Sequence, residues 1–285
     1  MKSLFKLSLI AIALLFTNAA FAQQKTHLGD NAALRYWAAF SEMQDSGITP
    51  EQAKELSLIL KGTSPYRDLS YRELIEKNIP ALTVMARGTA IPDCDWGLDY
   101  DLGPQTPVEY VRKSLELGRL NVLYAFHLSR AGDKEATART LVAGIHFSHD
   151  VAAGGSLFAT IVAKDLLINH FKVIEGLLHL QALPAAQRPE LQKAIAQLGP
   201  TGLDWQMAMT YEFGALNRPE WQKPLQNIRQ SYMAALNDKS VLPDLQAKIS
   251  KAPADLQQVI PNPKRVLEEK QDFSDQLQHI RDVLQ

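Results

Sequence analysis

Two histidines and an aspartate form the densest group of potential metal ligands in the sequence. They lie in the segment His146-Phe147-Ser148-His149-Asp150, with the imidazoles three residues apart and the carboxylate four residues after the first imidazole. At this spacing all three side chains can share one side of a helix, and such groups bind divalent metals or transfer protons. The segment lacks the HExxH order of zinc hydrolases, and a helix C-terminus favours histidine for electrostatic reasons alone. Two alternatives therefore stand: a divalent metal bound by His146, His149 and Asp150, or a structural role for all three.

The segment 93–101 is an acidic loop that could contribute further ligands. It reads Asp-Cys-Asp-Trp-Gly-Leu-Asp-Tyr-Asp, and carboxylates of this density can gather around a hard cation. The loop does not fit an EF-hand, because the glycine position and the terminal bidentate glutamate are absent. The alternative is that the aspartates cap turns while the aromatic rings fix the loop to the body. The residues of this candidate ligand loop are Asp93, Asp95, Trp96, Asp99 and Asp101.

Three weaker candidates complete the chemistry that the sequence offers. Cys94 is the only cysteine, and its acidic neighbours disfavour a thiolate, so we expect a packed thiol rather than a nucleophile. Glu175 and His179 are four residues apart, a spacing that permits a buried pair or part of an internal polar site. The tryptophans could line a ligand groove, although aromatic residues at helical spacing usually belong to the core; they are Trp37, Trp96, Trp205 and Trp221.

The elements that position these residues are predicted to be helices throughout. Helix start signals recur, as in Thr49-Pro50-Glu51-Gln52, in the Ser70/Glu73 and Thr106/Glu109 pairs, and at Asp133 and Asn262. No stretch alternates apolar and polar residues for long enough to predict a sheet. Pro80 is expected to break or kink its helix. The expected helices cover 31–44, 50–61, 71–89, 107–130, 134–150, 156–181, 187–198, 203–217, 220–236, 243–250 and 263–284.

The centre of the chain predicts helical hairpins. The short Ala131-Gly132-Asp133 turn makes the helices on either side antiparallel neighbours, and the helix from 156 is apolar around most of its girth, so it should be the most buried. The fold class is therefore all-α, with antiparallel hairpins stacked in a tetratricopeptide-like repeat or an irregular α-solenoid array. Residues 23–183 form the hairpin domain, and 184–285 form a C-terminal subregion with shorter helices.

Residues 1–22 have the features of a cleavable signal peptide. Lys2 and Lys6 precede an apolar run from Leu7 to Phe16, and 20–22 read Ala-Phe-Ala. The run is too short to remain as a membrane-spanning anchor. Removing two of the 30 basic residues leaves 28 against 31 acidic ones, a net charge of −3, and no basic cluster indicates nucleic acid as a partner. We expect an exported, periplasmic or extracellular protein without a disulfide.

Two motifs resemble a group of uncharacterised exported bacterial helical proteins. The first is Asp30-Asn31-Ala32-Ala33 followed by Tyr36-Trp37 and Phe40, and the second is the "CDWG" sequence within 94–99. The similarity extends from about residue 30 to about residue 180. What the resemblance implies is architecture, since the group brings no established activity or cofactor.

The leading hypothesis from the sequence is a non-enzymatic binding or scaffold protein of the cell envelope. Its partner would be a protein, a peptide or an envelope component held between helical hairpins. No cofactor is predicted for this function. The alternative is a metal-dependent enzyme that uses His146, His149 and Asp150 with the acidic loop. A third hypothesis is an oligomer joined through residues 263–285.

Overall fold

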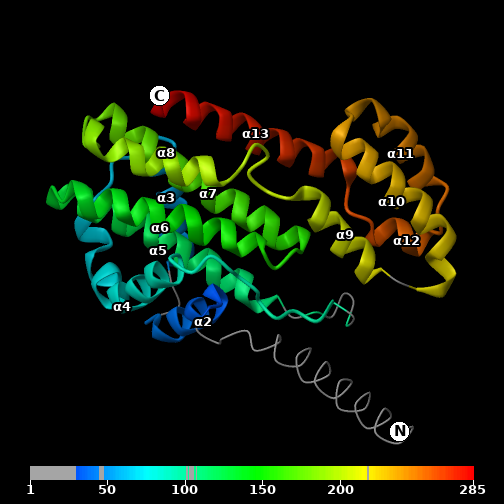
Figure 1. Ribbon diagram of the computed structural model, residues 1–285, viewed down its shortest axis with the longest axis horizontal. Coiled ribbons are helices and arrows are strands. Elements are labelled where there is room, and N and C mark those ends of the chain that lie inside the picture. The colour runs from blue at the N-terminus through cyan, green and yellow to red at the C-terminus, as the bar shows by residue number, and fades with distance from the viewer. Residues whose placement is uncertain (1–29, 45–47, 101, 103–105, 107, 217) are drawn as a thin grey trace, which may run out of the picture.

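The computed structural model describes residues 30–44, 48–100, 102, 106, 108–216 and 218–285. The proposed signal peptide and Asp101 lie outside these ranges. The described chain consists of helices, connecting turns and a single isolated β-bridge between Asn31 and Asp93. The all-α prediction is confirmed, and the helices pack against one another in an array (Figure 1).

The helix boundaries agree with those expected from the sequence to within two residues. The α-helices are α2 (Ala32–Glu42), α3 (Pro50–Leu60), α4 (Arg72–Gly88), α5 (Glu109–Ala131), α6 (Lys134–Ala152), α7 (Leu157–His179), α8 (Arg188–Gln197), α9 (Trp205–Ala215), α10 (Gln222–Asn237), α11 (Leu242–Ser250), α12 (Ala254–Val259) and α13 (Pro263–Leu284). The one that the sequence did not predict is α12, whose six residues are too few for an apolar period to show.

Several of the expected helix caps are present. Thr49 accepts a hydrogen bond from the N–H of Gln52 while the Gln52 side chain accepts one from Thr49, so the capping box of α3 is complete. The side chains of Asp133 and Asn262 also cap their helices, α6 and α13, by accepting from the N–H of Ala136 and of Arg265. Local sequence therefore sets where these three helices begin.

Two expected caps are wrong, and of the break or kink expected at Pro80 the break is absent. Ser70 belongs to a 3-10 turn (Asp68–Ser70), and α4 starts after Tyr71 without a side-chain cap. The hydroxyl of Thr106 donates to the carbonyl of Asp99, so α5 starts after Val108 instead. The helix α4 also continues through Pro80. This proline is exposed, so water can bond to the carbonyl whose partner N–H is missing.

The centre of the molecule is formed by α5, α6 and α7. Each is joined to the next by a short turn, and each pair packs along its length. Among the described helices α7 has the most buried residues, as the sequence predicted. It lies between α5 and α6 on one side and α13 on the other.

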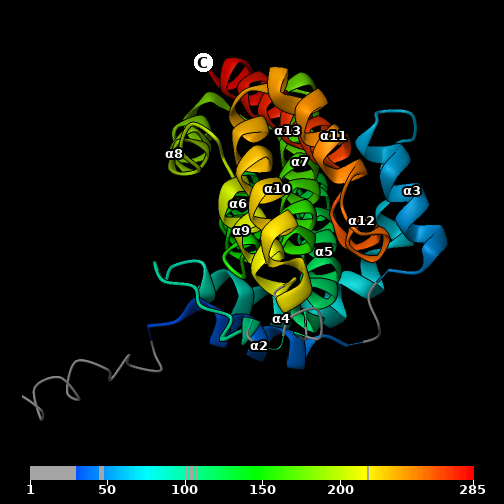
Figure 2. The same cartoon turned by 90° about the vertical axis from the view of Figure 1, so that its right-hand side faces the viewer.

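The remaining helices cover this centre. Figure 1 shows α2 and α4 below the central helices, α13 above them, and α9 to α12 gathered at one end of the long axis. Figure 2 shows α3 and α8 on opposite sides of the centre. None of the described helices is long and apolar enough to cross a membrane. The apolar face of α13 is buried within the chain and connects the C-terminal helices to α7 and α8; it comprises Val266, Leu267, Phe273, Leu277, Ile280 and Leu284.

Candidate ligand-binding groove

The three side chains of the expected metal cluster point to different surroundings. His146 is half-buried, and partial burial together with the nearby Lys193 ammonium lowers its pKa. His149 is exposed. The carboxylate of Asp150 accepts a short hydrogen bond from the hydroxyl of Tyr36 on α2. No three His, Cys, Asp or Glu side chains converge as metal ligands within the part of the chain that the structure describes, and a metal bound by this cluster stays a prediction.

The acidic loop does meet the end of α6, through its ring and thiol rather than its carboxylates. The indole Nε1 of Trp96 donates to the backbone carbonyl of Asp150 at 2.8 Å, and the thiol of Cys94 lies 3.7 Å from the same carbonyl. Burial raises the pKa of the Cys94 thiol, and the charges of Asp150 and Asp95 raise it further. Cys94 is thus held as a thiol, in agreement with the expectation from the sequence.

The loop aspartates make turn contacts. Asp95 accepts a hydrogen bond from the N–H of Gly97 at 2.9 Å, and its own N–H donates to the side chain of Asn31. The backbone carbonyl of Asp93 accepts from the N–H of Ala32 at 2.8 Å. These bonds fasten the loop to the start of α2, which is the structural alternative that the sequence left open.

The two motifs behind the family resemblance form one cluster of aromatic rings, which we call the aromatic cluster. Trp96 is its centre, 6% exposed. It stacks on Tyr110 with ring centroids 4.1 Å apart and also lies against the rings of Tyr36, Trp37 and Phe40. Aromatic stacking and buried ring area make this cluster a source of stability.

Other candidates from the sequence also turn out to be structural. Trp205 and Trp221 are buried, as core residues should be. Glu175 and His179 are both exposed, so the expected buried pair does not exist. Instead Glu175 lies 3.2 Å from the Nε2 atom of His279 on α13, because the polar side of α7 faces that helix near its end.

A buried histidine that the sequence did not single out lies in the centre of the bundle. His170 has no exposed surface, and burial lowers its pKa to about 4, so the ring is neutral. Its Nδ1 lies 2.7 Å from the carbonyl of Leu166 and its Nε2 lies 2.9 Å from the side-chain amide of Asn121. A ring that donates from Nδ1 accepts at Nε2, so the amide nitrogen belongs there. A Cβ at Gly144 would meet both groups, which leaves no room for a ligand.

A groove of about 1150 Å³ opens where the C-terminal ends of three helices meet. The helices α3 and α5 end beside it at Leu60 and Ala131, α7 ends beside it at His179, and Val283 of α13 closes one side. The turn 61–66, which follows α3, completes the wall. The volume lies just above the roughly 300 to 1000 Å³ that is usual for small-ligand pockets.

All three helix ends close with the same backbone turn. After α3, the N–H of Thr63 bonds to the carbonyl of Leu58 and Gly62 adopts a left-handed φ of 69°, which is a Schellman motif. The turn satisfies carbonyls that the helix leaves without partners and directs the chain along the groove wall. Equivalent bonds join Asp133 to Leu128 after α5 and Ala182 to Leu177 after α7.

The turn after α7 carries a backbone strain beside the groove. Gln181 has a φ of 55°, and no other non-glycine residue in the described chain has a positive φ. This conformation costs roughly 1 kcal/mol for a residue with a Cβ. It places the neighbouring Leu180, which is 72% exposed, on the groove wall.

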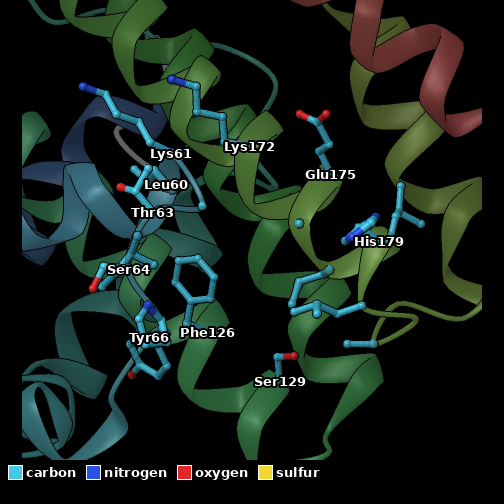
Figure 3. A pocket seen from close by; sticks show the side chains of 18 of the residues that line it. Leu60, Lys61, Thr63, Ser64, Tyr66, Phe126, Ser129, Lys172, Glu175 and His179 are labelled. Atoms are coloured by element: carbon cyan, nitrogen blue, oxygen red, sulfur yellow. The ribbon is translucent and has the colours of Figure 1, made fainter.

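The groove combines an apolar floor with polar groups at its rim (Figure 3). The rings of Tyr66 and Phe126 stack on the floor with centroids 5.1 Å apart. Figure 3 shows Lys61 and Lys172 near each other at one end. The remaining polar lining residues are Thr63, Ser64, Ser129, Arg130, Glu175 and His179, and the other large apolar ones include Leu60, Leu177, Leu178 and Leu180.

The floor is fixed from below by an ionic network. The hydroxyl of Tyr66 donates to Asp68 at 3.3 Å, and Nδ1 of His127 lies 2.6 Å from the same carboxylate oxygen. Arg72 donates twice to the other oxygen, at 3.0 and 2.6 Å. Burial raises the pKa of Asp68, but the hydrogen bonds from His127 and Arg72 outweigh it and lower the pKa overall. The carboxylate therefore stays charged and holds Tyr66 beside Phe126.

Two lysines on α7 show how the charge of the groove arises. Lys164 is buried and forms ion pairs with Glu269, Asp165 and Asp272, as a buried ammonium requires. Lys172, two turns later, lines the groove and forms no ion pair within the described chain. The positive charge of α7 is therefore neutralised at Lys164, beside α13, and is left without an ion pair at Lys172, in the groove.

Comparisons with family models, with curated proteins and with solved structures gave no match for this chain. The resemblance to uncharacterised exported helical proteins rests on its motifs and stays a prediction.

The sequence offered little that could have indicated the groove. Its lining residues come from four separate parts of the chain, within 59–66, 126–130 and 172–182 and at 283, and their types are ordinary for helix ends. One signal was available: Gly176 interrupts an otherwise strongly helical segment, and such a glycine often has a packing or functional reason. A Cβ at this position would have nothing within 4 Å, so the glycine widens the groove rather than serving close packing.

Proposed function

We propose that this protein is a non-enzymatic binding protein of the cell envelope, and that the groove between α3, α5 and α7 holds a segment of its partner. The observation that carries the proposal is the groove itself, whose stacked aromatic floor and charged rim face solvent. Export follows from the features of residues 1–22, and it would place the partner in the periplasm or outside the cell. An open groove between helices is a common site for peptide recognition.

Blocking the groove with one side chain tests the proposal. Gly176→Trp places an indole in the groove, where a Cβ meets no atom within 4 Å. Gly214→Trp is the matched control, because Gly214 is also an exposed helical glycine with open space around it but does not line the groove. Thermal unfolding followed by circular dichroism would show that both variants are folded.

The readout is the recovery of envelope proteins from extracts by each variant, measured by quantitative mass spectrometry. We expect a protein that the parent and Gly214→Trp recover equally and that Gly176→Trp loses. Equal recovery by all three proteins would contradict a role for the groove, and so would recovery of no specific partner by the parent.

A further inference from the structure

We infer that the groove recognises an acidic, amphipathic polypeptide segment, whose apolar side chains cover the Tyr66 and Phe126 rings and whose carboxylates meet Lys61, Lys172 and Arg130. This inference rests on the proposed function and names the chemistry of its partner. It is carried by the arrangement of charge around the groove, by the mixture of groups along its walls, and by its open shape.

The charge around the groove is positive although the chain as a whole is slightly acidic. Lys61, Arg130 and Lys172 line the groove, and none of them forms an ion pair with another described residue. The lining contains one carboxylate, Glu175, which lies 3.2 Å from the Nε2 atom of His279, against three cationic side chains. The formal charge of the whole sequence is −1, so this surface departs in sign from the rest. An anionic partner is the electrostatic complement.

Helix dipoles account for only part of this arrangement. The C-terminal ends of α3 and α5 carry partial negative charge, which favours Lys61 and Arg130 where they stand. The dipole effect fades within the last turn of a helix, and Lys172 lies two turns before the end of α7. Lys172 therefore lines the groove beyond the reach of the α7 dipole and forms no ion pair with another described residue.

The walls favour a polypeptide over an acyl chain. Ser64 and Ser129 bring hydroxyl groups into a lining that also contains apolar side chains, and the exposed glycines Gly62 and Gly176 leave backbone accessible there. A hydrocarbon chain gains from a continuous apolar enclosure, whereas a peptide can also use hydroxyl and backbone groups. A peptide can also reach cations at the rim while its apolar side chains occupy the floor.

A peptide selection tests the inference and separates it from the proposed function. Random-sequence peptides displayed on phage would be selected on the purified parent, Gly176→Trp and Gly214→Trp. We expect enrichment of Asp and Glu together with apolar residues on the parent and Gly214→Trp, and no enrichment on Gly176→Trp. Binding that survives Gly176→Trp would overturn the proposed function as well. Groove-dependent peptides without acidic enrichment would overturn only the inference, and recovery of no peptide would overturn it too.

A titration with the best selected peptide then tests the named cations. The Lys61→Gln/Lys172→Gln variant should bind about 3 to 20 times more weakly, because each exposed charge pair contributes at most about 1 kcal/mol. Lys223→Gln removes an exposed lysine outside the groove and should change the Kd by less than about twofold. An unchanged Kd in the double variant would contradict the assignment. Vesicles of phosphatidylglycerol form a second arm, and groove-dependent binding to them with no peptide selected would identify a lipid surface instead.

Discussion

The two ends of α5 present opposite kinds of surface. At its start, Tyr110 stacks on Trp96 within the aromatic cluster, and both of these rings are buried. At its end, Phe126 and Ser129 line an open groove. Some twenty residues separate the two ends, or roughly 30 Å along the helix.

This difference shows which residue types indicate function in this chain. The rare residues that attract attention in the sequence, such as Trp96 and Cys94, hold the closed end together through the backbone carbonyl of Asp150. The open end consists of lysines, leucines, serines and glycines that are common on any helix. Rare residues here indicate packing, while common residues brought together by three helix ends make the candidate site.

The largest expected effect comes from removing the ring at the centre of the closed end. Trp96→Ala should lower the free energy of unfolding by about 3 to 5 kcal/mol, because it leaves a cavity and removes a buried hydrogen bond. Leu180→Ala, at the open end, should cost less than about 0.5 kcal/mol. Chemical denaturation of both variants measures the difference. Similar losses in the two variants would mean that the ends do not differ as described.

The next effect is a dependence of stability on pH. Burial raises the pKa of Asp150 to about 6, although the hydrogen bond from Tyr36 lowers it. The folded state then binds more protons than the unfolded state between about pH 4 and 6. The contribution of Asp150 to the free energy of unfolding therefore falls as the pH rises. His170 has the opposite slope, because its pKa of about 4 in the folded state is below the unfolded value of about 6.5.

Asp150→Asn should therefore remove the pH dependence of stability that Asp150 causes and leave the opposite one that His170 causes. Relative to the parent, the variant should be more stable at pH 7 than at pH 4 by up to roughly 2 to 3 kcal/mol. Urea denaturation at several pH values measures this difference. Tyr36→Phe keeps the ring but removes the hydrogen bond, and it should shift the Asp150 titration to higher pH. A stability difference that is the same at all pH values would refute the assignment.

The smallest effect is expected from a glycine-to-alanine substitution, made once at the open end of α5 and once at the closed end. Gly176→Ala should raise the free energy of unfolding by about 0.5 to 1 kcal/mol, since it removes a helix glycine without a clash. Gly154→Ala should lower it by about 1 to 3 kcal/mol, because the new Cβ would lie 1.8 Å from the Tyr110 hydroxyl. Thermal melts of both variants measure the sign. Two changes of the same sign would contradict the contrast between an open and a packed end.

Much of the fold could be predicted because its signals are local. The capping box at Thr49 and the caps at Asp133 and Asn262 act within one turn of chain, and an apolar period defines each long helix. The failures also have local causes. Ser70 and Thr106 have side chains that can cap a helix. Ser70 instead lies in a 3-10 turn, and the Thr106 hydroxyl instead bonds to the acidic loop.

The candidate site could not be predicted in the same way. The residues of the acidic loop were identified as a unit, and the structure does place them against Asp150, but through Trp96 and Cys94. The groove depends on where α3, α5 and α7 end relative to one another, and no spacing in the sequence expresses that. Glu175 pairs with a histidine more than 100 positions away.

The sequence by itself determined the helices, most of their ends, and the near balance of charge. It also determined that α7 would be buried, since an apolar surface around a helix must be covered by other helices. Tertiary structure alone decided that Trp96 and the lone thiol would fill a closed end, and that three helix ends would leave a positive groove. The physical reason is that helix formation depends on neighbours within a turn, whereas a groove is the space left between helices that pack from distant parts of the chain.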